Sequence, residues 1–149
     1  MNSFFEEIFE YQNEVNQDIL AQLLDLEKEI PSKVLDLLSH SINAQKLWNY
    51  RILGKNDNIA FVTHSLEKLI VLDLQNFNEV LHILMTKKLS ERIDYKSTSG
   101  KAYHNTIQEI LTQVSQHFQY HRGQIISELL KHHITLKPTD YIYFRRKSK

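Results

Sequence analysis

Residues that interrupt helices are rare in this chain, and this scarcity constrains its fold more than any other feature. Glycine occurs three times and proline twice in 149 residues. A domain built mainly of sheets needs many turns, and glycine and proline are the residues that most often form them. The sequence therefore favours a few long helices joined by short connections.

Apolar residues recur at helical spacing in four segments of the chain. Spacings of three and four residues place side chains on one face of a helix. This periodicity predicts helices over residues 3–28, 32–53, 65–88 and 105–131. Four amphipathic helices in a chain of this length predict an all-α four-helix bundle that forms a single domain over residues 1–149.

Two shorter stretches do not fit the helical pattern. Residues 94–104 are polar and rich in turn-forming residues, and Tyr95 and Tyr103 within them are expected to lie in a short extended excursion. Pro138 cannot continue a helix, so residues 139–144, "TDYIYF", are expected to pack as a short extended C-terminal tail.

The composition excludes several classes of function. Cysteine is absent, which excludes disulfides, thiolate metal ligands and a cysteine nucleophile. Eighteen basic residues balance eighteen acidic ones, so the chain has no overall attraction to nucleic acid. No apolar run is long enough to cross a bilayer, and the first residues lack a secretory pattern. We therefore expect a cytoplasmic protein without a nucleic-acid or membrane partner.

Two of the eight histidines stand four residues apart in the fourth predicted helix. At ~100° per residue, His121 falls within roughly 40° of the centre of the apolar stripe, and His117 lies at the edge of that stripe. Both imidazoles leave the same face of the helix, which is a known metal-chelating arrangement. His64 and His82, by contrast, are expected to face solvent.

His40, in the second predicted helix, lies on a weaker apolar strip outside the main stripe of that helix. This position is consistent with either a packing role or a ligand role. Three imidazoles from two facing helices would leave coordination positions free for water or substrate, which is the pattern of catalytic rather than structural metal sites.

Two sequence blocks resemble the DinB/YfiT-like family of metal-binding four-helix-bundle proteins. They are "LLSHSINAQKLW" at 37–48 and "QHFQYHRGQI" at 116–125, and the closing "PTDYIYF" at 138–144 supports them. The spacing of the blocks extends the resemblance over the whole chain.

The resemblance implies a divalent metal ion, usually zinc or nickel, bound by His40, His117 and His121. Imidazole nitrogen accepts both metals. The sequence departs from many relatives at Gln113, where they carry a further histidine that is not normally a ligand. Relatives commonly pair, so a homodimer is expected, and Gly123 lies off the core stripe where close approach would be easiest.

Three functions are compatible with this resemblance. The first is a metal-dependent thiol S-transferase that uses a low-molecular-weight thiol as cosubstrate and acts on a small-molecule substrate. The second is a hydrolase that uses metal-bound hydroxide, and the third is a non-enzymatic metal-binding stress-response protein. A metal ion held by neutral imidazoles can lower the pKa of bound water toward ~7 or hold a thiol as thiolate, so the site chemistry suits the first two equally.

Two residues near the predicted ligands could support the site. Asp36 precedes His40 by one turn and could orient it, or could be an exposed aspartate near a helix start. Gln124 follows His121 by about one turn and could hold water or substrate, or could be a simple glutamine at the bundle edge.

Overall fold

The computed structural model describes residues 2–26 and 28–146 of the chain. It is mostly helical, with four long helices, one short helix and one two-stranded sheet in the described residues. In chain order the elements are α1 (Asn2–Leu24), α2 (Ser32–Leu53), α3 (Leu66–Thr86), β1 (Arg92–Lys96), β2 (Ala102–Thr106), α4 (Ile107–Lys131) and α5 (Tyr141–Arg146). The expected all-α class is supported, with the addition of the small sheet.

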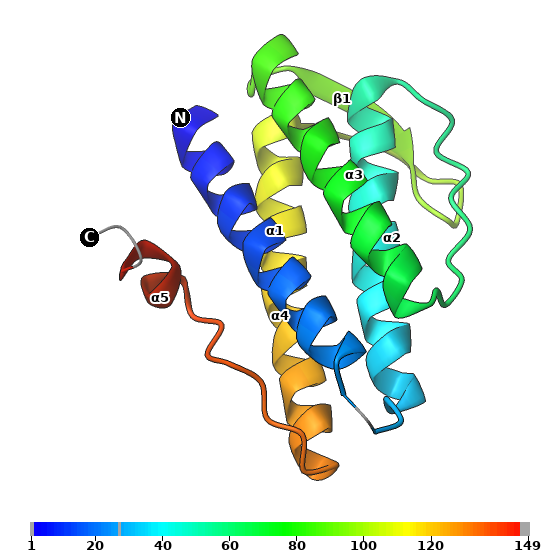
Figure 1. Ribbon diagram of the computed structural model, residues 1–149. Helices are drawn as coiled ribbons and strands as arrows, with labels where there is room; N and C mark the ends of the chain where they lie inside the picture. Colours follow the sequence, from blue (N-terminus) through cyan, green and yellow to red (C-terminus); the bar gives the residue numbers. More distant parts are fainter. Residues whose placement is uncertain (1, 27, 147–149) are drawn as a thin grey trace.

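The four long helices lie side by side (Figure 1). Helices α1 and α2 each pack against both α3 and α4. The β1–β2 hairpin contacts α2 and α4 and so lies beside one end of the interface between them. None of the described helices combines the length and the apolar character that crossing a membrane would require.

Local signals set the ends of the helices close to where the sequence predicts them. Gly54 ends α2 in the left-handed conformation, with φ of 66°, and its N–H donates to the carbonyls of Arg51 and Tyr50. Thr106 caps α4 through a capping box with Glu109. Helix α4 begins at Ile107 and not at residue 105 as predicted, because residues 105 and 106 belong to β2.

The predicted extended excursion is an antiparallel hairpin. Tyr95 pairs with Tyr103 in its register, and the two rings stack with centroids 6.0 Å apart. Tyr95 also packs edge-on against Trp48 of α2, with centroids 5.0 Å apart. The hairpin is thus attached to α2 by aromatic contacts as well as by chain connectivity.

The predicted extended C-terminal tail is wrong for residues Tyr141–Arg146, which form the short helix α5. Tyr141 and Phe144 both contact the ring of Tyr11, with centroids 5.3 and 5.7 Å away. Side chains three residues apart share one face in a helix but point to opposite faces in a strand, so contact with a single ring favours the helix.

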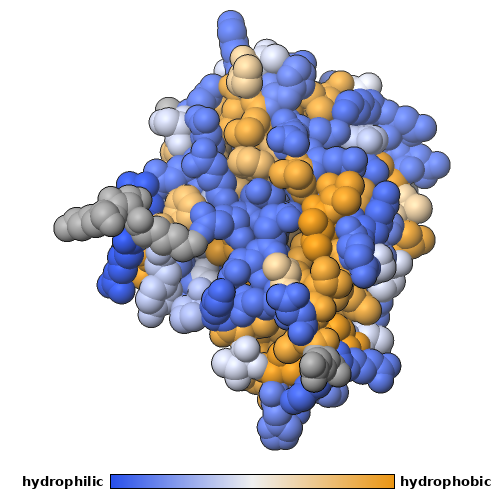
Figure 2. Space-filling view, viewed as in Figure 1, coloured by the Kyte–Doolittle hydropathy of each residue, from blue (hydrophilic) through white to orange (hydrophobic). Residues whose placement is uncertain are grey.

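On the face shown in Figure 2, apolar residues gather along α3 within a mostly hydrophilic surface. Val71 and Leu74 of α3 are each 48% exposed. This strip lies on a different helix from the histidines predicted to bind metal, which are on α2 and α4.

The core consists of two apolar clusters separated by polar side chains. On α1, α2 and α3, six of the buried polar residues fall between residues of the first cluster and residues of the second. These residues are Gln12, Asn16, Gln45, Asn49, Asp73 and Asn76. Most of them pair with one another or with the backbone, as buried polar groups require.

Asp73 is the acidic member of this polar layer. Its carboxylate accepts hydrogen bonds from the side-chain amides of Asn13, Asn16 and Gln17 of α1, at 2.8–2.9 Å. Burial raises the pKa of Asp73 from 3.8 to about 6, against the lowering effect of these hydrogen bonds. The folded protein therefore keeps a proton on Asp73 at pH values where the unfolded chain has released it.

We expect Asp73 to make the protein less stable as pH rises from about 4 to about 7. The raised pKa contributes up to about 3 kcal/mol to the free energy of unfolding below pH ~4, and this contribution is lost as pH passes about 6. Urea unfolding across this range should give a flatter pH dependence for Asp73→Asn than for the wild type. The exposed Asp94→Asn serves as control, and parallel profiles for wild type and Asp73→Asn would contradict the prediction.

Candidate metal centre

The structure brings the three predicted ligands together between α2 and α4. The Nε2 atom of His117 lies 3.2 Å from Nε2 of His40 and 3.0 Å from Nε2 of His121. One ring nitrogen of each histidine lies within 4.8 Å of the others, and no other group of three histidine or acidic residues in the described part of the chain comes together in this way. Two metal–nitrogen bonds of ~2.0–2.1 Å at a tetrahedral angle hold their nitrogens about 3.3 Å apart. The two distances from His117 therefore match two nitrogens on one metal ion, and the third imidazole lies close enough to join them.

The environment of the triad favours neutral imidazoles. His117 and His121 are half-buried and His40 is exposed, so the group lies at the surface of the α2–α4 interface. Burial, followed by the charges of His121 and His40, lowers the pKa of His117 to about 4. Burial and His121 also lower the pKa of His40. A neutral imidazole keeps the lone pair that a metal ion requires, so no proton needs to leave these two rings at neutral pH.

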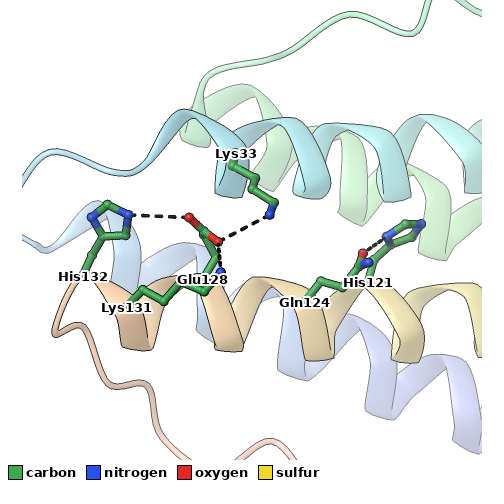
Figure 3. A network of polar contacts seen from close by, with 6 residues as sticks. All are labelled: Lys33, His121, Gln124, Glu128, Lys131 and His132. Atoms are coloured by element: carbon green, nitrogen blue, oxygen red, sulfur yellow. Dashed lines mark hydrogen bonds and ion pairs between the residues drawn. The ribbon is translucent and has the colours of Figure 1, made fainter.

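Gln124 fixes the orientation of His121. Its Oε1 accepts a hydrogen bond from Nδ1 of His121 at 2.7 Å, as Figure 3 shows. This contact places the proton on Nδ1 and leaves the lone pair of Nε2 directed at the other two histidines. The Nε2 of Gln124 donates in turn to the hydroxyl of Tyr120 at 3.3 Å. The structure thus gives Gln124 a supporting contact to a ligand.

We expect Gln124→Ala to weaken zinc binding by roughly 10–100-fold, the usual cost of losing an outer contact to a metal-bound histidine. His121 would then be free to rotate and to adopt the other tautomer. Competition with a chelating dye measures the change, and Gln116→Ala, an exposed glutamine next to His117, is the matched control. Equal zinc affinities for Gln124→Ala and Gln116→Ala would show that the contact between Gln124 and His121 does not contribute to metal binding.

The loop between α2 and α3 lies beside the exposed edge of His40. The ring of Phe61 is 5.7 Å from that of His40, and both line a pocket of about 240 Å³. The side-chain amide of Asn43 donates to the carbonyl of Val62 at 3.0 Å and so holds the loop against α2. Phe61 is therefore part of the wall around the site, which the sequence pattern did not indicate.

This loop decides between the two alternatives for Asp36 and corrects the prediction for His64. Asp36 is an exposed aspartate near the start of α2, and it accepts a hydrogen bond from the hydroxyl of Thr63 in the loop at 2.5 Å. His64 was expected to face solvent but is half-buried, and its ring lies 3.1 Å from the Oδ1 of Asn43. Both residues hold the loop rather than a metal ion. His82 is exposed, as predicted.

A second pocket, of about 380 Å³, lies on the hairpin side of the triad. It is lined by Trp48, Tyr95, Asn105, Glu109, Ile110 and Gln113. Gln113 is one helical turn from His117, so the pocket adjoins the triad along α4. The hairpin supplies part of the lining of this pocket, and α2 and α4 supply the rest. Local periodicity does not show that these distant segments meet.

The similarity of this chain to known proteins extends over nearly its whole length. No family model matches the chain. The curated Protein DinB of Bacillus subtilis (strain 168) is 26% identical over 161 aligned residues, which cover 95% of this chain and 93% of the relative. The likeness is therefore distant, but it is not confined to the histidine blocks.

Proposed function

We propose that this chain, a distant member of the DinB-like family, binds a divalent metal ion through His40, His117 and His121. The observation that carries the proposal is the convergence of the three imidazoles: the Nε2 of His117 lies 3.2 Å from that of His40 and 3.0 Å from that of His121, close to the separation expected for two nitrogens on one ion. Zinc and nickel are the metals that we expect, since imidazole nitrogen suits both.

We further propose that the scaffold is a single-domain four-helix bundle of the DinB-like type. The protein would act in the cytoplasm on a small-molecule substrate, without a nucleic-acid or membrane partner. The balanced charge of the chain supports the absence of a nucleic-acid partner.

The reaction that we propose is transfer to a low-molecular-weight thiol. When bound, the metal ion would lower the pKa of a thiol or of water and so supply a nucleophile at neutral pH. The chain contains no cysteine, so the thiol has to be a cosubstrate. Three protein ligands leave further coordination positions open, and the exposed edge of His40 gives access to them.

In the described residues, no hydrogen bond or ion pair links a carboxylate to the triad. The hydrogen bond of Gln124 and the ring contacts of Phe61 and Tyr120 join these side chains to the histidines. The proton released by the thiol would therefore leave to solvent, and the protein would contribute position and electrostatics. A hydrolase that uses metal-bound hydroxide is the alternative, because the same open positions would accept water.

A single experiment separates these functions. Zinc- and nickel-loaded protein is tested with chlorodinitrobenzene in the presence of several thiols, and with activated esters in the absence of thiol. Turnover that depends on a thiol and is lost in His117→Ala is the expected result. Ester hydrolysis without thiol would support the hydrolase, and no turnover in either assay would support a non-enzymatic metal-binding protein of stress response.

A homodimer remains our prediction for the oligomeric state. Gly123 is exposed, and a Cβ atom added there would meet nothing within 4 Å, so packing within the chain does not require this glycine. Light scattering at micromolar concentration should give about twice the mass of one chain. A mass equal to that of one chain would contradict the prediction.

A further inference from the structure

A pocket of about 350 Å³ opens between α2 and α4 on the side of the triad opposite the hairpin. We call it the basic pocket; its lining is Lys33, Leu37, Tyr120, Gly123, Gln124, Ser127, Glu128 and Lys131. It adjoins the triad directly. Gln124 is hydrogen-bonded to His121, and the rings of Tyr120 and His121 lie 5.1 Å apart.

Two ammonium groups share one carboxylate in the basic pocket. The Nζ of Lys131 lies 3.0 Å from Oε2 of Glu128, and the Nζ of Lys33 lies 3.5 Å from the same atom (Figure 3). The hydrogen bond from Lys131 and the charges of both lysines lower the pKa of Glu128, so it stays ionised. The pocket then keeps a net positive charge.

The two lysines retain the capacity to bind another anion. Their side chains are 61% and 63% exposed, whereas that of Glu128 is 14% exposed. Each ammonium has three N–H donors, and both ion pairs with Glu128 use one oxygen atom, Oε2, so donors on both lysines remain for another acceptor. A ligand carboxylate could therefore approach from solvent and share both cations with Glu128.

The distance to the triad sets the length of such a ligand. Glu128 follows His121 by seven residues on α4, which is about 10 Å along the helix axis. Figure 3 shows the Lys33–Glu128 contact and the His121–Gln124 contact along the same α2–α4 interface. Glu128, which holds both ammonium groups, therefore lies roughly two helical turns from His121 along α4.

No lysine or arginine is among the described residues that line the pocket on the hairpin side, and its one charged lining residue is the acidic Glu109. Arg51 lies over the rings of Trp48 and Tyr95, but its guanidinium is bound to Asp57 and to the carbonyl of Lys96. An anion should therefore prefer the basic pocket.

We propose that the basic pocket binds the anionic end of the molecule that reacts at the triad. The substrate class is a small molecule with a carboxylate or a similar anionic group about 10 Å from its metal-binding atom. This inference rests on the proposed function and specifies where the anionic end of the cosubstrate lies.

Thiols of graded length test the inference without an activity assay. Cobalt(II)-loaded protein is titrated with mercaptoacetate, mercaptohexanoate and mercaptooctanoate, whose thiol and carboxylate are at opposite ends, and with their methyl esters. Thiolate-to-cobalt absorption reports binding. The longest acid should bind about three- to tenfold more tightly than its ester at low ionic strength. Added salt should reduce this preference, because the lysines are exposed and their charges are screened. Mercaptoacetate is too short and should show no such preference.

Variants assign the preference to the basic pocket. The double variant Lys33→Met, Lys131→Met should bind the longest acid and its ester equally. Glu128→Gln should increase the preference for the acid, because the competing carboxylate is gone. Lys137→Met is the control, since Lys137 pairs with Asp18 and does not line the pocket. Equal affinity of acid and ester at every length, or a preference that survives in the double variant, would overturn the inference while leaving the proposed function intact. A cobalt spectrum that no thiol changes would overturn both.

Discussion

Replacement of His117 by alanine should reduce the affinity for zinc far more than the roughly 10–100-fold expected for an outer contact, because it removes a ligand. His117 holds the central position, with its Nε2 in contact with both other imidazoles. His40→Ala and His121→Ala should also leave only two protein ligands and weaken binding strongly. Elemental analysis of the purified variants and competition with a chelating dye measure the losses.

His82→Ala is the matched control for these variants. His82 is exposed on α3 and lies outside the triad, so its loss should leave zinc affinity unchanged. Unchanged metal content in two of the three triad variants would refute the assignment of the ligands.

The sequence predicts the parts of this site that depend on a single helix. His117 and His121 share a face because they are four residues apart, and the apolar stripe of the same helix shows that this face is directed inward. His40 is different, since the periodicity of α2 shows only the face of α2 on which His40 lies. It does not show which other helix that face meets. Its partner His117 is 77 residues away, and the resemblance to a family was needed to pair them.

Features that depend on contacts between distant segments cannot be predicted from the periodicity of one segment. Helix α5 forms because Tyr141 and Phe144 meet Tyr11, which is 130 residues earlier in the chain. The buried polar layer was also missed, because isolated polar residues such as Gln12 and Asn49 look like interruptions of an apolar stripe. Their partners are supplied by other helices, as Gln45 is for Gln12.

Removal of the metal ion should leave the helices folded. None of the three histidines belongs to either apolar cluster, and those clusters lie on both sides of the polar layer along α1, α2 and α3. A core of this size stabilises the fold without an ion, unlike a zinc finger, which folds only when metal is bound. Protein treated with a chelator should therefore keep its helical circular dichroism at room temperature.

Bound metal should nevertheless raise the melting temperature substantially. An ion that binds only the folded state adds about 4 kcal/mol to the free energy of unfolding when free metal is a thousand times the dissociation constant. For a chain of this length, this corresponds to a shift of roughly 8–16 °C. Thermal melts with zinc and with chelator measure the shift, and His117→Ala should show almost none.

The two measurements together distinguish a functional site from a structural one. A site that serves chemistry can be empty without loss of the fold, because its open coordination positions and exposed edge are not needed for packing. If the chelated protein lost its helical signal, the triad would be holding α2 and α4 together, and the main physical reason for proposing an enzyme would be gone. Retained helices with a melting shift that depends on His117 are the result that the geometry predicts, since the ion would add a contact between two helices that already pack against each other.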